Sequence, residues 1–216
     1  MYKYVLFDLD GTLANTSPGV FKATDYMIDK LKLRPLTMDE KRSILGPPLW
    51  LSFNKFWGIE GKELEDAIEL YREFYVSKGF TQNDPYPGNE ELLSKLQKEG
   101  FILLVATSKP NHATPQVLDS LGYTKYFTYV ACPAPENEST DKSVLIIEAL
   151  TNAGCKNYSE AIMIGDRKFD ILGARKAGVD SIGITYGFGS VEELKEAGAT
   201  YICNSTKEIE NIMRTK

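Results

Sequence analysis

Two aspartates stand one residue apart in the stretch VLFDLDGT, directly after an apolar run. Alternate residues of a strand point to the same side, so Asp8 and Asp10 would bring two negative charges together where the run ends. A turn through Gly11 explains Asp10 by itself, but the ionised carboxylate of Asp8 needs a cation to offset its desolvation. Mg²⁺, a hard ion that retains several waters, suits a site with few carboxylates. The pair therefore predicts a Mg²⁺ site at a strand end.

Groups that suit the same site follow other predicted strands. Asp166 ends the run AIMIGD, and Asp170 comes four residues later, consistent with carboxylates of a second strand facing the same ion. Thr107 and Ser108 follow the run LLVA and offer a hydroxyl and backbone N–H groups at the expected start of the next helix, where anions bind. Lys142 opens the helical stretch DKSVLIIEAL and by itself would be interpreted as a surface lysine. Taken together, these residues indicate one shared polar site.

The elements that would hold these residues alternate between strands and helices. The apolar runs are short and continuous, which is typical of strands buried on both faces of a parallel sheet, and helical patterns such as NEELLSKLQKEG separate them. The alternation predicts an α/β fold with a doubly wound, mainly parallel, Rossmann-like sheet, in which ligands bind at the carboxyl ends of the strands. The expected strands span residues 4–7, 101–107, 127–132, 161–166, 180–185 and 200–204.

A long insert follows the first strand. Residues 15–84 contain no good strand and carry helix signals instead, among them Ser17 as an N-cap before Pro18, and a capping box formed by Thr37 and Glu40. About seventy residues are too many for a crossover connection. We therefore expect two domains, an all-helical insert of residues 15–84 and an α/β core of residues 1–14 and 85–216.

Composition limits the classes of partner. The 216 residues carry a net charge of −5, which argues against a nucleic-acid ligand. No apolar run approaches the roughly 20 residues that span a bilayer, and the N-terminus turns acidic too early for a secretory signal. The three cysteines are odd in number and match no metal spacing, which indicates free thiols in a reducing compartment. We expect a cytoplasmic protein that binds neither nucleic acid nor membranes.

Four motifs occur in an order that belongs to a known family. They are DLDGT at 8–12, VATSK at 105–109, the region of Lys142, and GDRKFD at 165–170. With these motifs, and with YPGNEELLSKL and GARKAGVDSIGITYG, essentially the whole chain resembles the haloacid dehalogenase-like hydrolase superfamily. Within it, the chain is similar to the phosphoglycolate phosphatase-like branch, whose members carry a helical cap. The insert matches that mobile cap.

The resemblance implies catalytic roles for four residues. Asp8 matches the nucleophile that becomes an aspartyl phosphate, and Asp10 matches the general acid and base. Thr107 matches the hydroxyl that binds the transferring phosphoryl group, and Lys142 matches the cation that steadies this group and the nucleophile. Further phosphate contacts are expected from loop N–H groups, including those of Gly11, Thr12 and Ser108.

The resemblance also implies the ligands of the metal ion. Asp8 and Asp166 match the acids that hold Mg²⁺, with Asp170 in a supporting role and Asp10 contributing its backbone carbonyl. Closure of the cap would exclude bulk water and supply contacts to the substrate.

The cap stretch LGPPLW, residues 45–50, is the one most expected to face the substrate. Gly46 and Pro47 would form a rigid turn there, with a plain connection between two helices as an equal alternative. Trp50 and the aromatic residues after it could floor a pocket, although packing inside the cap is the simpler interpretation. His112, the only histidine, is expected on the surface or at the cap of the helix that follows Thr107, with a position near the site as the alternative.

These features favour a Mg²⁺-dependent phosphatase of a small phosphorylated metabolite, such as phosphoglycolate, a sugar phosphate or a nucleoside monophosphate. A phosphomutase needs the same acids and is the first alternative, and a phosphorylatable signalling domain is the second. Asp10 argues against a true dehalogenase. No proline closely follows Lys142, and Phe169 precedes Asp170, both unlike many close relatives, which argues against phosphoglycolate itself as the substrate. The leaving group depends on side chains of the cap. A monomer and a homodimer are both compatible with the sequence.

Overall fold

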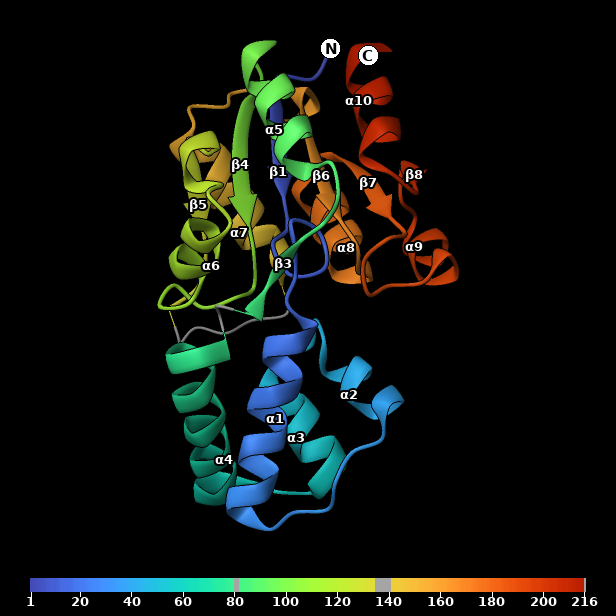
Figure 1. The fold of residues 1–216 in the computed structure, drawn as a ribbon. Coiled ribbons are helices and arrows are strands. Elements are labelled where there is room, and N and C mark those ends of the chain that lie inside the picture. The colour runs from blue at the N-terminus through green and yellow to red at the C-terminus, as the bar shows by residue number, and fades with distance from the viewer. Residues whose placement is uncertain (80–81, 135–140, 216) are drawn as a thin grey trace. The chain divides into compact units, whose positions relative to one another are not determined.

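The computed structural model describes residues 1–79, 82–134 and 141–215, so residues 80 and 81 of the expected insert lie outside the described residues. The chain divides into two compact units (Figure 1). One unit contains residues 1–15 and 85–216, and the other contains residues 16–84. The chain passes between them at the short strands β2 (Ala14–Asn15) and β3 (Asp84–Pro85), which pair with each other.

The first unit is built on a six-stranded sheet in the order β5-β4-β1-β6-β7-β8, and all of its pairings are parallel. This confirms the predicted doubly wound α/β fold. The chain runs from β1 outward through β4 and β5, and then returns to the other side of β1 at β6, which makes β1 the switch point where such sheets bind ligands. The strands are β1 (Tyr4–Phe7), β4 (Ile102–Ala106), β5 (Tyr129–Ala131), β6 (Ala161–Gly165), β7 (Asp180–Ile184) and β8 (Tyr201–Cys203).

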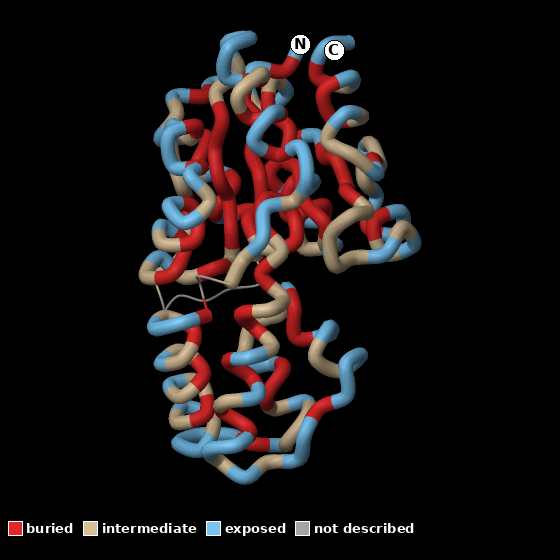
Figure 2. The backbone as a smooth tube through the Cα atoms, viewed as in Figure 1, coloured by how far each residue is buried: buried red, intermediate tan, exposed pale blue. Residues whose placement is uncertain are grey.

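Helices cover both faces of this sheet, which explains the continuous apolar runs. In Figure 1, α7 and α8 lie behind the sheet, and α5 lies in front of it. Tyr4 and Leu6 of β1 belong to one buried cluster with Ile146 of α7 and Ala174 of α8, and the central strands are drawn as buried in Figure 2. The helices are α5 (Asn89–Lys98), α6 (Thr114–Ser120), α7 (Lys142–Asn152), α8 (Lys168–Ala177), α9 (Val191–Ala197) and α10 (Thr206–Thr215), with 3₁₀ turns at Thr124–Tyr126 and Tyr158–Glu160.

The register of the sheet aligns three strand ends. Phe7 of β1 lies opposite Val105 of β4 on one side and Ile164 of β6 on the other. The residues that directly follow these strands are therefore brought to the same edge.

The second unit is helical. It consists of α1 (Ser17–Leu31), α2 (Met38–Ile44), α3 (Leu49–Trp57), α4 (Gly61–Phe74) and a π-helical turn at Tyr75–Gly79. The capping box of Thr37 and Glu40 is confirmed, because each side chain accepts a hydrogen bond from the backbone N–H of the other residue. The prediction of Ser17 as N-cap is wrong by one residue, since the carbonyl of Thr16 accepts the first helical bond, from Val20.

The aromatic residues of α3 divide between interior and surface. Phe53 is fully buried and its ring packs edge-on against Trp57 and Tyr71, as expected for the interior of the helical unit. Trp50, by contrast, is 45% exposed. Gly46 and Pro47 form the connection between α2 and α3, where Gly46 adopts a φ of 103° that a residue with a Cβ rarely takes.

None of the helices in the described part of the chain has both the length and the apolar character that are needed to cross a lipid bilayer.

Candidate active site

A tight turn follows β1 and presents Asp8 at the edge of the sheet. The backbone N–H of Asp8 still donates to the carbonyl of Ile164, at 2.9 Å, so this residue is tied to β6 as well as to its own strand. The chain then reverses through Gly11, whose φ is 85°. A Cβ at Gly11 would overlap the carboxylate of Asp166, so only glycine allows the turn to lie this close to the neighbouring strand end.

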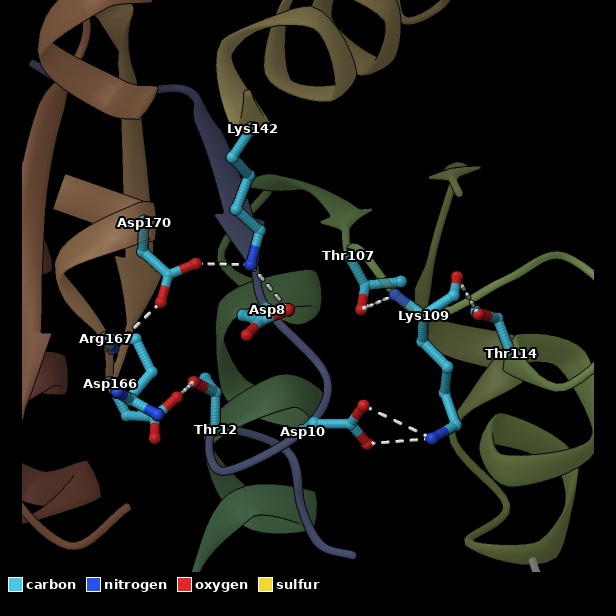
Figure 3. A network of polar contacts seen from close by, with 10 residues as sticks. All are labelled: Asp8, Asp10, Thr12, Thr107, Lys109, Thr114, Lys142, Asp166, Arg167 and Asp170. Carbon is cyan, nitrogen blue, oxygen red and sulfur yellow. Dashed lines mark hydrogen bonds and ion pairs between the residues drawn. The ribbon is translucent and has the colours of Figure 1, made fainter. Parts of the chain in front are cut away.

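Three buried carboxylates meet beside this turn. Among the described residues, the acids close enough to share a metal ion are Asp8, Asp166 and Asp170, with one oxygen of each within 4.8 Å of the others. Asp8 follows β1, Asp166 follows β6, and Asp170 lies in the first turn of α8 (Figure 3). The structure thus brings together three of the four acids that the sequence singled out.

Lys142 lies among these acids. It is the first residue of α7, and its ammonium nitrogen lies 2.7 Å from Asp8 and also pairs with Asp170. Its neighbour Asp141 accepts a hydrogen bond from the N–H of Ser143 and so caps the helix. Burial opposes the charged form of Lys142, but the charges of Asp170 and Asp8 outweigh it and raise the pKa of the lysine above its ordinary value. Lys142 is therefore not a surface residue.

The acids carry more negative charge than Lys142 balances. Burial raises the pKa of Asp8 to about 7, against the opposing effect of Lys142. Burial, together with the neighbouring charges of Asp170 and Asp8, also raises the pKa of Asp166 well above its ordinary range. One ammonium faces three carboxylates, so the donor set fits a hard divalent cation with oxygen ligands.

Asp166 is held from two sides by groups outside the acid cluster. The hydroxyl of Thr12 donates to one carboxylate oxygen at 3.3 Å, and the backbone N–H of Phe188 donates to the other at 2.7 Å. Phe188 belongs to the loop after β7. A Cβ at Gly187 would overlap both the carbonyl of Gly11 and the side chain of Asp166, so this loop closes over the carboxylate only because it has glycine there.

The turn after β1 leaves few N–H groups for a phosphate. Gly11 donates its N–H to Ala14, and Thr12 donates its own to Leu9, while the Thr12 hydroxyl is used by Asp166. In the part of the chain that the structure describes, the N–H groups of Leu9 and Asp10 have no such acceptor. The phosphate contacts predicted for Gly11 and Thr12 thus involve groups that already have protein acceptors.

Asp10 does not join the acid cluster with its side chain. Its two carboxylate oxygens lie 3.1 and 3.2 Å from the ammonium nitrogen of Lys109. Figure 3 shows the carboxylate pointing toward Lys109 and away from Asp166 and Asp170. Lys109 has no predicted role, although it lies within the VATSK motif and directly precedes Pro110.

The segment after β4 differs from the prediction. Thr107 is 1% exposed at the strand end, and its hydroxyl oxygen accepts a hydrogen bond from the N–H of Lys109. The expected helix start at Thr107 and Ser108 is wrong, because α6 begins only at Thr114. His112 accordingly lies in the intervening turn and not on a helix. Pro110 favours this extension, since proline disfavours a helical conformation in the residue before it.

Comparison with known proteins identifies the family. Residues 5–184 match the sequence model of the haloacid dehalogenase-like hydrolases. The chain belongs to this family. It is 30% identical to a 5'-nucleotidase from Pseudomonas aeruginosa, over 99% of this chain and 96% of that protein. It is 29% identical to a phosphoglycolate phosphatase from Vibrio parahaemolyticus, over 96% of this chain and 94% of that protein.

A solved structure agrees with this assignment. The crystal structure of a predicted phosphatase from Clostridium acetobutylicum superimposes with a TM-score of 0.92 and 39% identity, and it covers 100% of both chains. The predicted resemblance to the phosphoglycolate phosphatase-like branch of the haloacid dehalogenase-like hydrolases is confirmed. The chain is a phosphatase of this family, which disfavours the signalling-domain alternative.

Proposed function

We propose that this haloacid dehalogenase-like phosphatase hydrolyses a small phosphomonoester through a phosphoenzyme formed on Asp8 and with the help of Mg²⁺. The observation that carries the proposal is the convergence of Asp8, Asp166 and Asp170 within 4.8 Å, with the Lys142 ammonium 2.7 Å from Asp8. A carboxylate that serves as nucleophile divides one difficult hydrolysis into two easier steps.

The metal site that we propose uses residues of the acid cluster. Asp8 and Asp166 would hold Mg²⁺, with Asp170 in direct or water-mediated contact and the backbone carbonyl of Asp10 as a further ligand. A bound Mg²⁺ would supply positive charge to the oxygens of the transferring phosphoryl group. The two hydrogen bonds that Asp166 accepts support its role as a fixed ligand.

In the first step, an oxygen of Asp8 attacks phosphorus and the bond from phosphorus to the ester oxygen breaks. Asp10, as a carboxylic acid, gives its proton to the departing alkoxide, so the leaving group departs as an alcohol. Lys142, the hydroxyl of Thr107 and the N–H groups of Leu9 and Asp10 would stabilise the charge on the equatorial oxygens. Ser108, half-buried beside Thr107, would add a further N–H.

In the second step, Asp10 has lost its proton and acts as a base. It takes a proton from a water molecule as that water attacks phosphorus, and the bond between phosphorus and the Asp8 oxygen breaks. Inorganic phosphate leaves, Asp8 is again a carboxylate, and Asp10 has regained its proton. The reaction is thus balanced without any further reactant.

The helical unit, residues 16–84, would act as the cap that sets the leaving group. Gly46 and Pro47, in the connection between α2 and α3, would contact the substrate there. The two related proteins named above have different substrates, as their names say. One acts on a 5'-nucleotide and the other on phosphoglycolate. We therefore propose a small phosphorylated metabolite as substrate, with a phosphomutase as the alternative.

Trapping the intermediate tests this function. Acid quenching during turnover with a ³²P-labelled ester should give a labelled protein in wild type and none in Asp8→Asn. Asp29→Asn is the matched control, because that side chain is 79% exposed in the helical unit. Retained turnover in Asp8→Asn would contradict the assignment of the nucleophile.

A second experiment addresses the substrate. Phosphate release from a panel containing phosphoglycolate, hexose phosphates and nucleoside monophosphates is measured with and without Mg²⁺. Hexose-phosphate interconversion without release of phosphate would favour the mutase.

A further inference from the structure

Two hydrogen bonds hold the backbone of Lys109 in place, independently of the contacts of its side chain. Its N–H donates to the hydroxyl oxygen of Thr107 at 3.2 Å, and its carbonyl accepts from the hydroxyl of Thr114 at 2.9 Å. Pro110 restricts the conformation of Lys109 further. The side chain of Lys109 therefore extends from a backbone segment that is held in place just after β4.

The ion pair of Lys109 with Asp10 is asymmetric in exposure. The Lys109 side chain is 6% exposed, whereas that of Asp10 is 26% exposed. A substrate could therefore reach the carboxylate more readily than the ammonium behind it. Since both oxygens of Asp10 lie within 3.2 Å of the ammonium, the lysine fixes the rotation of the carboxylate as well as its position.

The Asp10 carboxylate has a second possible partner, which is a cation bound by the acid cluster. Its carboxylate belongs to the same short turn as Asp8, and a cation held by Asp8 and Asp166 would attract it. In the structure it points the other way, toward Lys109 (Figure 3). We propose that Lys109 is a positioning residue that keeps the Asp10 carboxylate off the cation site and oriented for the leaving-group oxygen. This inference rests on the proposed function, in which Asp10 acts on that oxygen.

Two substrates of similar size separate positioning from a general structural role. Benzyl phosphate releases a poor leaving group that needs a proton, whereas 4-nitrophenyl phosphate releases a good one that does not. In Lys109→Met we expect kcat/KM to fall about 10- to 100-fold for benzyl phosphate and less than about threefold for 4-nitrophenyl phosphate. Lys109→Arg should restore part of the loss. Lys125→Met, which breaks an exposed ion pair with Glu90, should change neither value.

The Mg²⁺ affinity gives a readout that does not depend on turnover. If Lys109 keeps Asp10 off the cation site, titration calorimetry should show tighter Mg²⁺ binding in Lys109→Met than in wild type. If Lys109→Met instead disturbed the structure of the site, Mg²⁺ binding would be weaker than in wild type. Lys109→Gln, which keeps a polar side chain, provides the same comparison if the Met variant does not fold.

A double-mutant cycle completes the test. In an Asp10→Asn background, Lys109→Met should cause no further loss on benzyl phosphate. Equal losses on the two substrates, or an undiminished loss in that background, would overturn the positioning role while leaving the proposed function intact. Full activity of Asp10→Asn on benzyl phosphate would instead overturn the assignment of Asp10, and the inference with it.

Discussion

The ammonium nitrogen of Lys142 lies 2.7 Å from a carboxylate oxygen of Asp8, and the two side chains are only 3% and 10% exposed. Lys142 also pairs with Asp170, so this buried cation is shared by the acid that follows β1 and an acid of α8. Removing one partner from a buried ion pair leaves a charge without compensation, which costs more than the pair itself contributes. The stability of this site and its chemistry therefore depend on the same lysine.

Lys142→Met should destabilise the protein when Mg²⁺ is absent. Methionine keeps much of the apolar stem but removes the charge, and we expect the free energy of unfolding to fall by about 3–5 kcal/mol. Urea denaturation in EDTA measures this. The control is Lys176→Met, which breaks the ion pair of Lys176 with Asp141. The Lys176 side chain is 67% exposed, so this change should lower the free energy of unfolding by no more than about 1 kcal/mol. Equal stability of the two variants would contradict the prediction.

The stability of the metal-free protein should fall as the pH rises from about 4 to about 7. Burial raises the pKa of Asp8 to about 7 from its ordinary value of 3.8, so between these values the folded protein binds a proton that the unfolded chain releases. The stabilisation by the protonated Asp8 side chain is complete below pH 3.8, and it is lost as the pH rises through about 7. Mg²⁺ favours the carboxylate, so the rise in Tm on adding Mg²⁺ should grow over the same pH range.

Thermal unfolding with EDTA or Mg²⁺, measured between pH 4 and pH 8, checks both trends. Asp8→Asn should show a smaller slope in EDTA, because its side chain does not titrate. The slope should not vanish, since the pKa of Asp166 is raised as well. A slope in Asp8→Asn as steep as in wild type would assign the effect to other groups.

The proximity of Asp8 and Asp166 could be predicted from the sequence, because it follows from the geometry of parallel strands. Both residues directly follow short apolar runs, and parallel strands that bury both faces have their carboxyl ends at the same edge. Asp170 followed from Asp166, since a spacing of four residues keeps it within the first helical turn beyond the strand. Lys142 needed the family pattern, because nothing in its local sequence distinguishes it from an exposed lysine.

The contacts around these residues could not be predicted in the same way. Lys109 reaches Asp10 across 99 positions of the chain, and Phe188 reaches Asp166 from a loop with no periodic pattern. The glycines of that loop were a signal, yet their role depends on overlap with Gly11 and Asp166, which only coordinates reveal. The sequence predicts too early a start for α6, because the turn before this helix depends on hydrogen bonds of Lys109 with Thr107 and Thr114.

Gly187→Ala should weaken Mg²⁺ binding. The added methyl group would overlap the Gly11 carbonyl and the Asp166 side chain, so the loop or the carboxylate must move. Disturbing the partners that orient a metal ligand typically costs about 10- to 100-fold in metal affinity, and we expect a loss in that range by titration calorimetry. Gly122→Ala is the control, because its φ of 70° makes alanine unfavourable, while the added Cβ would lie more than 4 Å from any described atom beyond its chain neighbours. That variant should lose stability but keep its Mg²⁺ affinity.

Thr12→Val removes the second support of Asp166 without changing the shape of the side chain. The Thr12 hydroxyl donates to Asp166 at 3.3 Å and is buried, so valine leaves that carboxylate oxygen without its donor. The N–H of Phe188 remains, and we expect a loss of about tenfold in Mg²⁺ affinity, at the lower end of the range for such partners. Thr24→Val is the matched control, because its buried hydroxyl donates to the carbonyl of Val20 within α1. If Thr12→Val binds Mg²⁺ as tightly as Thr24→Val but turns over more slowly, the Thr12 hydroxyl acts on the phosphate and not through Asp166.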